Sequence, residues 1–590
     1  MEESAIKDGF NNLKPGKDFD GLYQAALCRS QADWLVGMNF SRMYSCLYNS
    51  NLSIGRVQTP TLAMIVEREH KIRAFVKEPY YTAEITGDIA DGATNRFTAA
   101  REKLQDKTQA ERISTACNGK PAVVKSVQQT DKTESAPKLY DLTTLQREAN
   151  KLFGYTAKQT LETAQKLYEM KVLTYPRTDS RYITEDMAGG IDALINAVPV
   201  LLPFKVDFDS DIGSINTPHI VNNAKVTDHH AILPTQAAAT ADVSALSTAE
   251  KNILFMVCTR LLSAVAKKHI YAETVIAVEC ESEVFTAKGK TVKQNGWKAI
   301  EQAFIAISGK ATKGKENKDN SLPQLFEGQQ YTAQSSIREG YTQPPRHFTE
   351  DTLLSAMENA TADDMPENFQ QERSGIGTPA TRADTIETLV KREYIVRKDK
   401  QLIPTEKGFS LIKVLPDNDS VKSPILTAEW EADLKKVEQK EMTADDFMDA
   451  ISRYVGDAVM KSKSAGVSDE HKALFPQSNG GGNGGKSGEV IGKCVRCGGD
   501  VVENSKAFSC VNTKDKKCGF VLFKDNKYFT AKKKTVTKAI AKALFTDGRI
   551  FMKDLHSEKT GKTYAANIFL DDKGEGYVSF RMEFDKGGKK

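Results

Sequence analysis

The stretch that decides the fold reads Leu173-Thr174-Tyr175-Pro176-Arg177-Thr178-Asp179-Ser180-Arg181-Tyr182. Proline ends the strand-like run Val172–Tyr175 and holds the tyrosine at a fixed angle at the end of that element. A phenol has an ordinary pKa near ~10 and needs a cation or a metal to act as a nucleophile. Arg177 and Arg181 can supply that charge and clamp a phosphate. From the spacing alone, the favoured interpretation of Tyr175 is merely a half-buried strand residue.

A second cluster follows at Asp228-His229-His230-Ala231-Ile232-Leu233-Pro234-Thr235. Histidines in such a place serve as metal ligands, acid/base groups or phosphate donors, or have no chemical role. Adjacent side chains on a strand point to opposite faces. We therefore expect at most one of His229 and His230 to face any given site.

Two glycine-containing loops each precede a helical pattern: Ser53-Ile-Gly55-Arg56-Val-Gln58-Thr-Pro60 and Gly375-Ile-Gly377-Thr378-Pro-Ala-Thr-Arg382. Free backbone N–H groups at a helix N-terminus can bind phosphate, and the arginines add charge. Neither loop is a Walker A motif, because no Gly-Lys-Ser/Thr follows. As isolated patterns, both are also typical of ordinary helix caps.

The surrounding chain alternates helical and strand patterns. Residues 142–170 have apolar positions at helical spacing, interrupted at Gly154. A helix over Thr381–Arg392 leads into two short strands within Tyr394–Pro404, and this order is typical of a winged helix. Residues 81–127 and 271–335 have alternating β-type runs. We predict a mixed α and β multidomain protein in which helices predominate.

Composition sets the class of protein. The 590 residues are 40% hydrophobic and 27% charged, which excludes wholesale disorder and a disulfide-stapled miniprotein. No apolar run reaches the ~18 residues of a membrane span, and Met1-Glu-Glu-Ser does not begin a signal peptide. We therefore expect a cytoplasmic protein. Residues 487–590 hold 22 Lys/Arg against 13 Asp/Glu, and such a basic tail favours a nucleic-acid partner.

The tail follows a glycine-rich tether, Gly480–Gly488, and a polar loop is expected at Ser308–Asn320. Four of the nine cysteines, Cys494, Cys497, Cys510 and Cys518, fall within 25 residues and predict a zinc site with four cysteine ligands. Aromatic residues lie among lysines in the same region, which predicts a grip on single-stranded DNA. They are Phe508, Phe520, Phe523, Tyr528 and Phe529, beside Lys514, Lys516, Lys517 and Lys532 to Lys534.

Taken together, these motifs resemble the type IA DNA topoisomerases, and most closely the bacterial topoisomerase III branch. The resemblance runs in family order from Glu2 to Met460. It is carried by Leu22–Arg29, Ala32–Asn39 with Arg42, Gly55–Leu62, Leu139–Ala149, Leu173–Ser180, His229–Thr235, Pro344-Pro345, Gly375–Arg382 and Leu426–Trp430. It implies a toroid of interleaved domains with winged-helix-like motifs, followed by a C-terminal zinc ribbon and repeat module. A tyrosine recombinase fits less well, because those enzymes carry their tyrosine near the C-terminus.

By this resemblance, Tyr175 is the nucleophile that attacks single-stranded DNA and forms a 5′-phosphotyrosyl link without ATP. Arg177 would stabilise the reacting phosphate, and His229 would help to protonate or orient. The positions that would line the single-strand groove are Arg29, Asp33, Arg42, Arg56, Gln58, Arg181, His230, Thr378 and Arg382. Single-stranded and underwound duplex DNA are the implied partners. A RecQ-like helicase is a further candidate, and the chain is expected to be a monomer in the bacterial cytoplasm, associated with the nucleoid or a mobile element.

The family also has an N-terminal Toprim domain with a catalytic glutamate and a Mg²⁺-binding acidic cluster, which we do not find in this sequence. The run Asp207-Phe-Asp209-Ser-Asp211 is the alternating acidic candidate that we find, and it lacks the family context. Three explanations stay open: a fragment, a miscalled start, or a separate polypeptide that supplies Toprim. The alternative to an enzyme is therefore a DNA-binding fragment that needs Toprim in trans.

The expected domains follow from these breaks. They are a first helical part of the gate base at 1–60, a β-rich arch at 61–135 and 271–335, a winged-helix-like tyrosine domain at 136–270, a second part of the base at 336–465, a linker at 466–490 and the zinc ribbon and repeat at 491–590.

Overall fold

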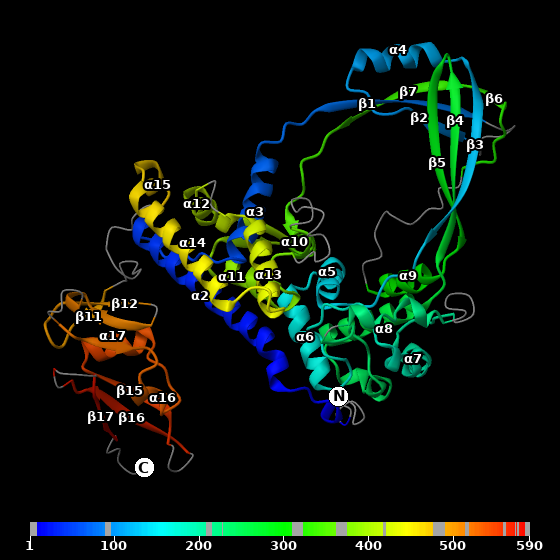
Figure 1. Cartoon of the computed structure of the whole chain (residues 1–590). Coiled ribbons are helices and arrows are strands. Elements are labelled where there is room, and N and C mark those ends of the chain that lie inside the picture. The colour runs from blue at the N-terminus through cyan, green and yellow to red at the C-terminus, as the bar shows by residue number, and fades with distance from the viewer. Residues whose placement is uncertain are drawn as a thin grey trace, which may run out of the picture. The chain divides into compact units, whose positions relative to one another are not determined.

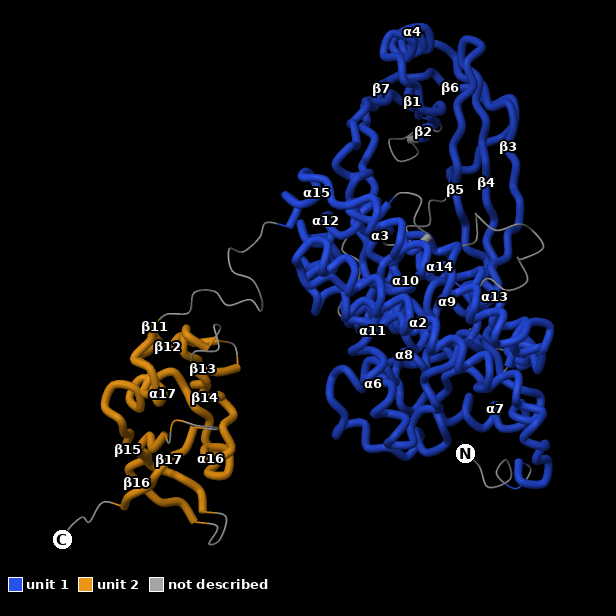
Figure 2. Tube along the Cα trace, turned by 60° about the vertical axis from the view of Figure 1, so that its left-hand side comes forward, with its two compact units in different colours: residues 1–476 blue, residues 477–590 orange. Residues whose placement is uncertain are grey.

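The computed structural model describes residues 7, 9–88, 96–207, 215–226, 228–308, 322–360, 375–416, 420–475, 490–504, 506–513, 518–557, 562–572, 574 and 578–584 (Figure 1). The chain divides into two compact units, Met1–Pro476 and Gln477–Lys590 (Figure 2). Several expected features lie outside the described residues: the tether Gly480–Gly488, nearly all of the loop Ser308–Asn320, Asp209 and Asp211 of the acidic run, and Lys514, Lys516 and Lys517.

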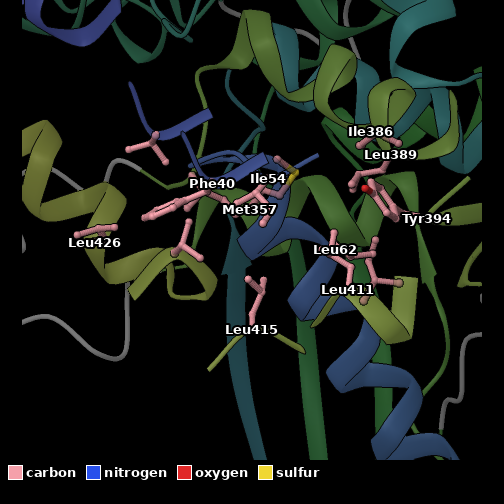
Figure 3. Packing of buried hydrophobic residues seen from close by; sticks show 14 of the residues in the cluster. Phe40, Ile54, Leu62, Met357, Ile386, Leu389, Tyr394, Leu411, Leu415 and Leu426 are labelled. Carbon is pink, nitrogen blue, oxygen red and sulfur yellow. The ribbon is translucent and has the colours of Figure 1, made fainter. Parts of the chain in front are cut away.

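The first unit contains a helical body that we call the base body. Its longest helix, α2 (Asp20–Tyr48), buries Ala25, Cys28, Ala32 and Val36 at helical spacing against its neighbours. The core beneath it joins distant parts of the chain, including Phe40, Leu62, Met357, Leu411 and Leu426 (Figure 3). The other helices are η1 (Gly16–Phe19), α3 (Gln58–Arg73), α10 (Glu350–Glu358), α11 (Pro379–Lys391), α12 (Glu406–Val414), η9 (Ser420–Lys422), α13 (Pro424–Glu438), α14 (Ala444–Ala465) and α15 (Asp469–Ala473).

A helix-and-hairpin unit lies within the base body, as the sequence predicted. Helix α11 leads into β9 (Ile395–Lys398) and β10 (Gln401–Pro404), and β8 (Phe348–Thr349) completes a three-stranded sheet in the order β8-β10-β9. Asp399 takes a left-handed conformation, with φ of 54°, in the turn between the two hairpin strands. The short polar turn therefore closes the hairpin as its composition indicated.

A second helical body, which we call the tyrosine body, carries Tyr175. Its helices α5 (Leu142–Phe153) and α6 (Ala157–Glu169) are separated at Gly154, whose φ of 75° ends α5 as predicted. The expected strand Val172–Tyr175 is wrong, because the described residues form only an isolated bridge there, between Leu173 and Pro234. Pro234 has no N–H to continue a ladder. The remaining helices are α7 (Glu185–Ala197), η2 (Val198–Leu201), η4 (Thr217–His219), η5 (Asn223–Lys225), η6 (Gln236–Thr240), η7 (Val243–Ala245), α8 (Thr248–Val265) and α9 (Trp297–Ile307).

An antiparallel seven-stranded sheet joins these two bodies. Its order is β6-β3-β4-β5-β2-β1-β7, and α4 (Lys107–Cys117) packs on it. Strands β1 and β7, at one edge of the sheet, connect to the base body, because β1 follows α3 and β7 precedes β8. Strands β3 and β4 connect to the tyrosine body, because β3 leads into α5 and β4 follows α8 (Figure 1). The strands are β1 (Pro79–Asp88), β2 (Arg96–Ala100), β3 (Pro121–Glu134), β4 (His269–Cys280), β5 (Glu283–Gln294), β6 (Gln330–Thr332) and β7 (Gln334–Tyr341).

The second unit has two small antiparallel sheets that share one core. The first sheet contains β11 (Val490–Lys493), β12 (Asp500–Glu503), β13 (Ala507–Cys510) and β14 (Val521–Phe523), and the second contains β15 (Arg549–His556), β16 (Thr563–Leu570) and β17 (Phe580–Glu583). The helices are η10 (Val511–Thr513), α16 (Lys527–Thr530) and α17 (Lys538–Thr546). Phe508, Phe520 and Phe529 are 0% exposed in this core, so the prediction that they contact DNA is wrong. A unit this small uses its large rings to build a core.

Candidate active site and single-strand groove

Tyr175 lies on the loop that leaves α6, two residues beyond the Leu173–Pro234 bridge. Thr174 fixes this loop, because its N–H donates to the carbonyl of Leu233 at 2.9 Å and its hydroxyl accepts from the Leu233 N–H at 2.9 Å. The ring of Tyr175 is half-buried and meets the ring of Tyr168 edge-on, with centroids 5.4 Å apart. Main-chain bonds and ring packing together set the position of the phenol.

His229 lies beside this tyrosine. The two ring centroids are 4.6 Å apart, with an angle of 47° between the planes. The Thr178 hydroxyl donates to the carbonyl of His229 at 3.0 Å, so the loop that carries Tyr175 also holds the histidine. His230 is half-buried, its Nδ1 lies 2.7 Å from the carbonyl of Ala231, and burial lowers the pKa of its imidazole. Of the two histidines, His229 is the one in ring contact with Tyr175.

The two arginines of the tyrosine motif have different surroundings. Arg177 is exposed on the loop, two residues beyond Tyr175. Arg181 lies with its Nε 2.6 Å from Asp141 Oδ2, and Asp141 also caps α5 by accepting the Thr144 N–H at 2.6 Å. Because Asp141 is buried and engaged twice, Arg181 is anchored to the protein, and Arg177 is the more accessible of the two for a phosphate.

Polar contacts join the tyrosine body to the base body along a seam formed by α5 and α6 on one side and α10 and β9–β10 on the other. Glu350 accepts the N–H of Ala157, the first residue of α6, at 2.5 Å and an Arg397 N–H at 2.8 Å. Lys400 donates to the carbonyls of Asn150 and Lys151 near the end of α5, both at 3.2 Å. An anion thus meets a helix N-terminus and a cation meets a helix C-terminus, as the helix dipole favours.

Arg382 lies at the same seam and is 5% exposed. It donates to the carbonyl of Ile376 at 3.2 Å and across the seam to the Thr143 hydroxyl at 3.1 Å, and burial lowers its pKa. Thr378 is exposed and caps α11 together with Thr381. Gly375 is required here because a Cβ would lie 1.9 Å from the carbonyl oxygen of Met357.

Five of the nine residues expected to line a groove lie on α2 or at the start of α3, namely Arg29, Asp33, Arg42, Arg56 and Gln58, whereas Arg181, His230, Thr378 and Arg382 lie elsewhere. Arg56 is 7% exposed and lies 2.7 Å from Asp33 and 2.8 Å from Glu431, which also holds Arg29 at 2.5 Å. Arg56 is therefore an internal cross-link between α2 and α13. Gln58 donates to the Ser53 hydroxyl at 3.0 Å. A pocket beside them is lined by Asp33, Trp34, Met38, Arg42, Asn51 and Arg392, among others.

The four clustered cysteines converge in the second unit. Their sulfur atoms all lie within 4.8 Å of one another, with Cys494 and Cys518 3.6 Å apart and Cys497 and Cys510 3.4 Å apart. A hydrogen bond from the Gly499 N–H, assisted by Asn512, lowers the pKa of Cys497 to about 6. Four converging sulfurs, one of them readily ionised, fit a tetrahedral zinc ion.

Comparison with known proteins agrees with this arrangement. The family model described as DNA topoisomerase matches residues 17–449, which include Tyr175, His229, Arg382 and Glu431. The chain belongs to the DNA topoisomerase family. It is 38% identical over 480 residues to DNA topoisomerase 3 of Bacillus licheniformis, covering 80% of this chain and 65% of that protein. It is 36% identical over 538 residues to DNA topoisomerase 3 of Bacillus subtilis, covering 88% and 70%.

This topoisomerase-family chain thus spans about two thirds of the length of these relatives. Its fold is similar to that of full-length topoisomerase I from Thermotoga maritima, with a TM-score of 0.58 and 22% identity over 88% of this chain and 79% of that one. The predicted resemblance to topoisomerases and the predicted mixed α and β fold are confirmed. None of the described helices has the length and apolar character needed to cross a membrane.

Sequence reasoning missed the partners that hold this chain together. Glu431, Asp141 and Glu350 bind arginines 375, 40 and 47 positions away in the chain. Asp141 lies within the matching stretch Leu139–Ala149, but nothing in that stretch points to Arg181 as its partner. Glu431 directly follows the matching stretch Leu426–Trp430, which was the only available signal for it.

Proposed function

We propose that this chain is the DNA-cutting and strand-passing part of a type IA topoisomerase of the topoisomerase 3 kind. The observation that carries the proposal is the Tyr175–His229 ring contact at 4.6 Å, on a loop held by Thr174 and Thr178 within the family match. A tyrosine fixed beside an exposed histidine and followed by an exposed arginine suits attack on a phosphodiester.

The reaction that we assign exchanges one phosphoester for another. The Tyr175 hydroxyl gives up its proton as its oxygen bonds to phosphorus, the bond from phosphorus to the 3′ oxygen breaks, and the 3′ oxygen takes up a proton to become a hydroxyl. Arg177 would stabilise the charge on the pentacovalent phosphate, and His229 would orient the phenol and exchange protons at the reacting oxygens. Resealing is the reverse, and it needs no ATP because the phosphotyrosyl bond retains the energy of the diester.

We further infer that single-stranded DNA approaches along the pocket on α2, where Arg42 is exposed and Trp34 is 63% exposed. Arg56, Arg181 and Arg382, being engaged in internal contacts, would act mainly by holding the shape of the groove and seam. Underwound duplex DNA is the larger substrate that we assign. The proposal also includes a RecQ-like helicase partner, a monomeric state and a cytoplasmic location at the nucleoid or a mobile element.

Two metals bear on this proposal. Zn²⁺ would be held by Cys494, Cys497, Cys510 and Cys518 and would stabilise the second unit. In the cleavage chemistry implied for the family, Mg²⁺ would neutralise phosphate charge. Within the described residues, the four cysteines are the one group of three or more possible ligands, and thiolates do not suit Mg²⁺, so we assign no magnesium site to these residues.

The test uses the labelled ends of a single-stranded oligonucleotide. The purified chain is incubated with Mg²⁺ and DNA that is labelled at either the 3′ or the 5′ end, then denatured with SDS. A 5′-phosphotyrosyl link retains the 3′-labelled fragment on the protein and releases the 5′-labelled one. With a Toprim segment added in trans to supply the metal site, we expect a 3′-labelled adduct that disappears in Tyr175→Phe. An adduct with the 5′ label would contradict the chemistry, and DNA binding without any adduct would leave the chain as a binding fragment.

A further inference from the structure

Two buried cysteines that the proposed chemistry does not use meet where α4 packs on the seven-stranded sheet. Cys117 ends α4, Cys280 ends β4, and the two are 0% and 1% exposed. The Cys117 thiol donates to the carbonyl of Cys280 at 3.4 Å, and the Cys280 thiol donates to the carbonyl of Cys117 at 3.7 Å. The two residues are 163 positions apart, so chain folding brings them together. We call them the thiol pair.

The two thiols of the pair differ in how readily they ionise. Burial raises the pKa of both, and that of Cys280 reaches about 12. A contact between the two thiols lowers the pKa of Cys117 and raises that of Cys280. The charged groups that act on the pair are two cations, Arg101 and Lys120, and one carboxylate, Glu281, while Glu283 pairs with Arg101. Cys117 is therefore the thiol that forms a thiolate first, and Cys280 stays protonated beside it.

A polar group without a partner belongs to the same core cluster. Tyr331 is 7% exposed, and its hydroxyl is buried with no hydrogen-bond partner in the described part of the chain. Burial raises the pKa of this phenol, and the nearby Cys280 raises it further. A buried donor that has no acceptor costs free energy, so the Tyr331 hydroxyl is ready to donate to an oxygen bound to sulfur at the pair.

The thiol pair lies directly beneath two surface turns. Residues 118–120, which follow Cys117, are exposed, and so are Glu281 and Ser282, which follow Cys280. Glu281 and Ser282 have φ of 49° and 67°, a left-handed conformation that other turns usually give to glycine. The ends of elements beside such turns open locally far more often than the whole domain unfolds. A reagent as small as a water molecule can therefore reach the sulfurs without unfolding of the sheet.

We propose that the thiol pair is a site of reversible oxidation, at which hydrogen peroxide joins Cys117 to Cys280 in a disulfide. The Cys117 thiolate attacks one peroxide oxygen, the O–O bond breaks, and the released hydroxide takes up the proton that Cys117 lost, which leaves a sulfenic acid and one water. The Cys280 sulfur then attacks the Cys117 sulfur, the S–O bond breaks, and the oxygen leaves with the Cys280 proton as a second water. The two thiols lose two electrons and the peroxide gains them.

The disulfide would change how the tyrosine body is held. Strand β3 leads into α5 and β4 follows α8, so the segment between the two cysteines contains α5, α6, α7 and α8. The bond closes this segment into a covalent ring, and a cross-link across a long segment restricts the unfolded chain. The equilibrium constant for unfolding of the ring should therefore fall by roughly 30- to 1000-fold. A thiol reductant would restore the original value.

The test is peptide mapping of the full chain after treatment with hydrogen peroxide, with Zn²⁺ added to occupy the four clustered cysteines of the second unit. Free thiols are blocked with iodoacetamide under denaturing conditions, and the chain is digested with trypsin without a reductant. We expect peptide 113–125 linked to peptide 269–288, lighter than their sum by two hydrogen atoms and separated again by dithiothreitol. Cys117→Ala should abolish the link. Cys258→Ala, at an equally buried cysteine in α8, is the matched control and should keep it.

Amide hydrogen exchange of the wild-type chain gives a second measurement that needs no variant. The buried amides of α8 should exchange roughly 30- to 1000-fold more slowly in the linked chain than after dithiothreitol. Unlinked peptides 113–125 and 269–288 from a sample in which the exposed Cys46 is oxidised would overturn the proposal, as would links from Cys117 to other cysteines. Unchanged exchange in a linked chain would overturn the effect on the tyrosine body. The proposed cleavage at Tyr175 stands apart from these outcomes, because the test contains no DNA.

Discussion

Glu350 should control how firmly the tyrosine body stays on the base body. It is 3% exposed and accepts the Ala157 N–H across the seam as well as an Arg397 N–H. Truncation to alanine leaves the Ala157 N–H buried without its acceptor, which costs about 1–3 kcal/mol. Loss of the anion at the α6 N-terminus adds about 0.3–2 kcal/mol. Arg397 keeps Glu387 at 2.6 Å, so the larger penalty for an unpaired buried charge is avoided.

The expected weakening of the seam is therefore about 2–4 kcal/mol in Glu350→Ala, or a roughly 30- to 1000-fold change in its opening equilibrium. In Glu350→Gln an amide oxygen can still accept, so we expect about 1–2 kcal/mol. Amide hydrogen exchange of Ala157 and the first turn of α6 measures this opening directly.

The matched control is Glu387→Gln, which removes the other carboxylate from Arg397 without crossing the seam. It should leave exchange at Ala157 near the wild-type rate. If Glu387→Gln loosens α6 as much as Glu350→Gln does, the effect comes from Arg397 and the reasoning is refuted. The same holds if Glu350→Ala leaves the exchange of Ala157 unchanged.

Three further predictions concern single residues. Cys497 is exposed and its pKa is lowered to about 6, so in metal-free protein at pH 7 it should react with iodoacetamide before the buried Cys510 does. The reaction should slow as the pH falls below 6 and should stop once zinc is bound. Mass spectrometry measures the labelling of each cysteine, and faster labelling of Cys510 would contradict this prediction. Arg56→Ala should destabilise the base body by about 2–4 kcal/mol, because Asp33 loses its partner while Glu431 keeps only Arg29. Urea unfolding followed by tryptophan fluorescence measures this free energy, and the control Arg42→Ala, at an exposed site, should change it little. Gly375→Ala should lower the free energy of unfolding by about 1–3 kcal/mol, because the added Cβ clashes with Met357. Gly456→Ala in α14, where nothing lies within 4 Å of the added Cβ, should raise it by about 0.5–1 kcal/mol. Equal melting temperatures of the two variants would refute the clash.

Local physics made part of the fold predictable from sequence. The break between α5 and α6 follows from Gly154, which takes a φ of 75° that other residues disfavour. The α11 helix and its hairpin follow from apolar spacing and a polar turn. The strand expected at Val172–Tyr175 failed because a strand needs a partner, and the partner segment holds Pro234.

The sequence by itself determined the residue types of the candidate site: a tyrosine before Pro-Arg, two histidines, two glycine loops and four cysteines. These are short-range patterns whose chemistry is visible without coordinates. Only the tertiary structure decided which of them meet. It put His229 rather than His230 in ring contact with Tyr175, and it engaged Arg56 and Arg181 in ion pairs.

The burial of rings in the second unit was also beyond the sequence. Phe508 and Phe551 both lie among lysines in the chain, but one is 0% and the other 47% exposed. The difference comes from strand register and from how two small sheets share one core. The contacts of Glu431 with Arg56 and of Glu350 with Ala157 join residues 375 and 193 positions apart, and no local pattern encodes them because chain folding alone brings these residues together.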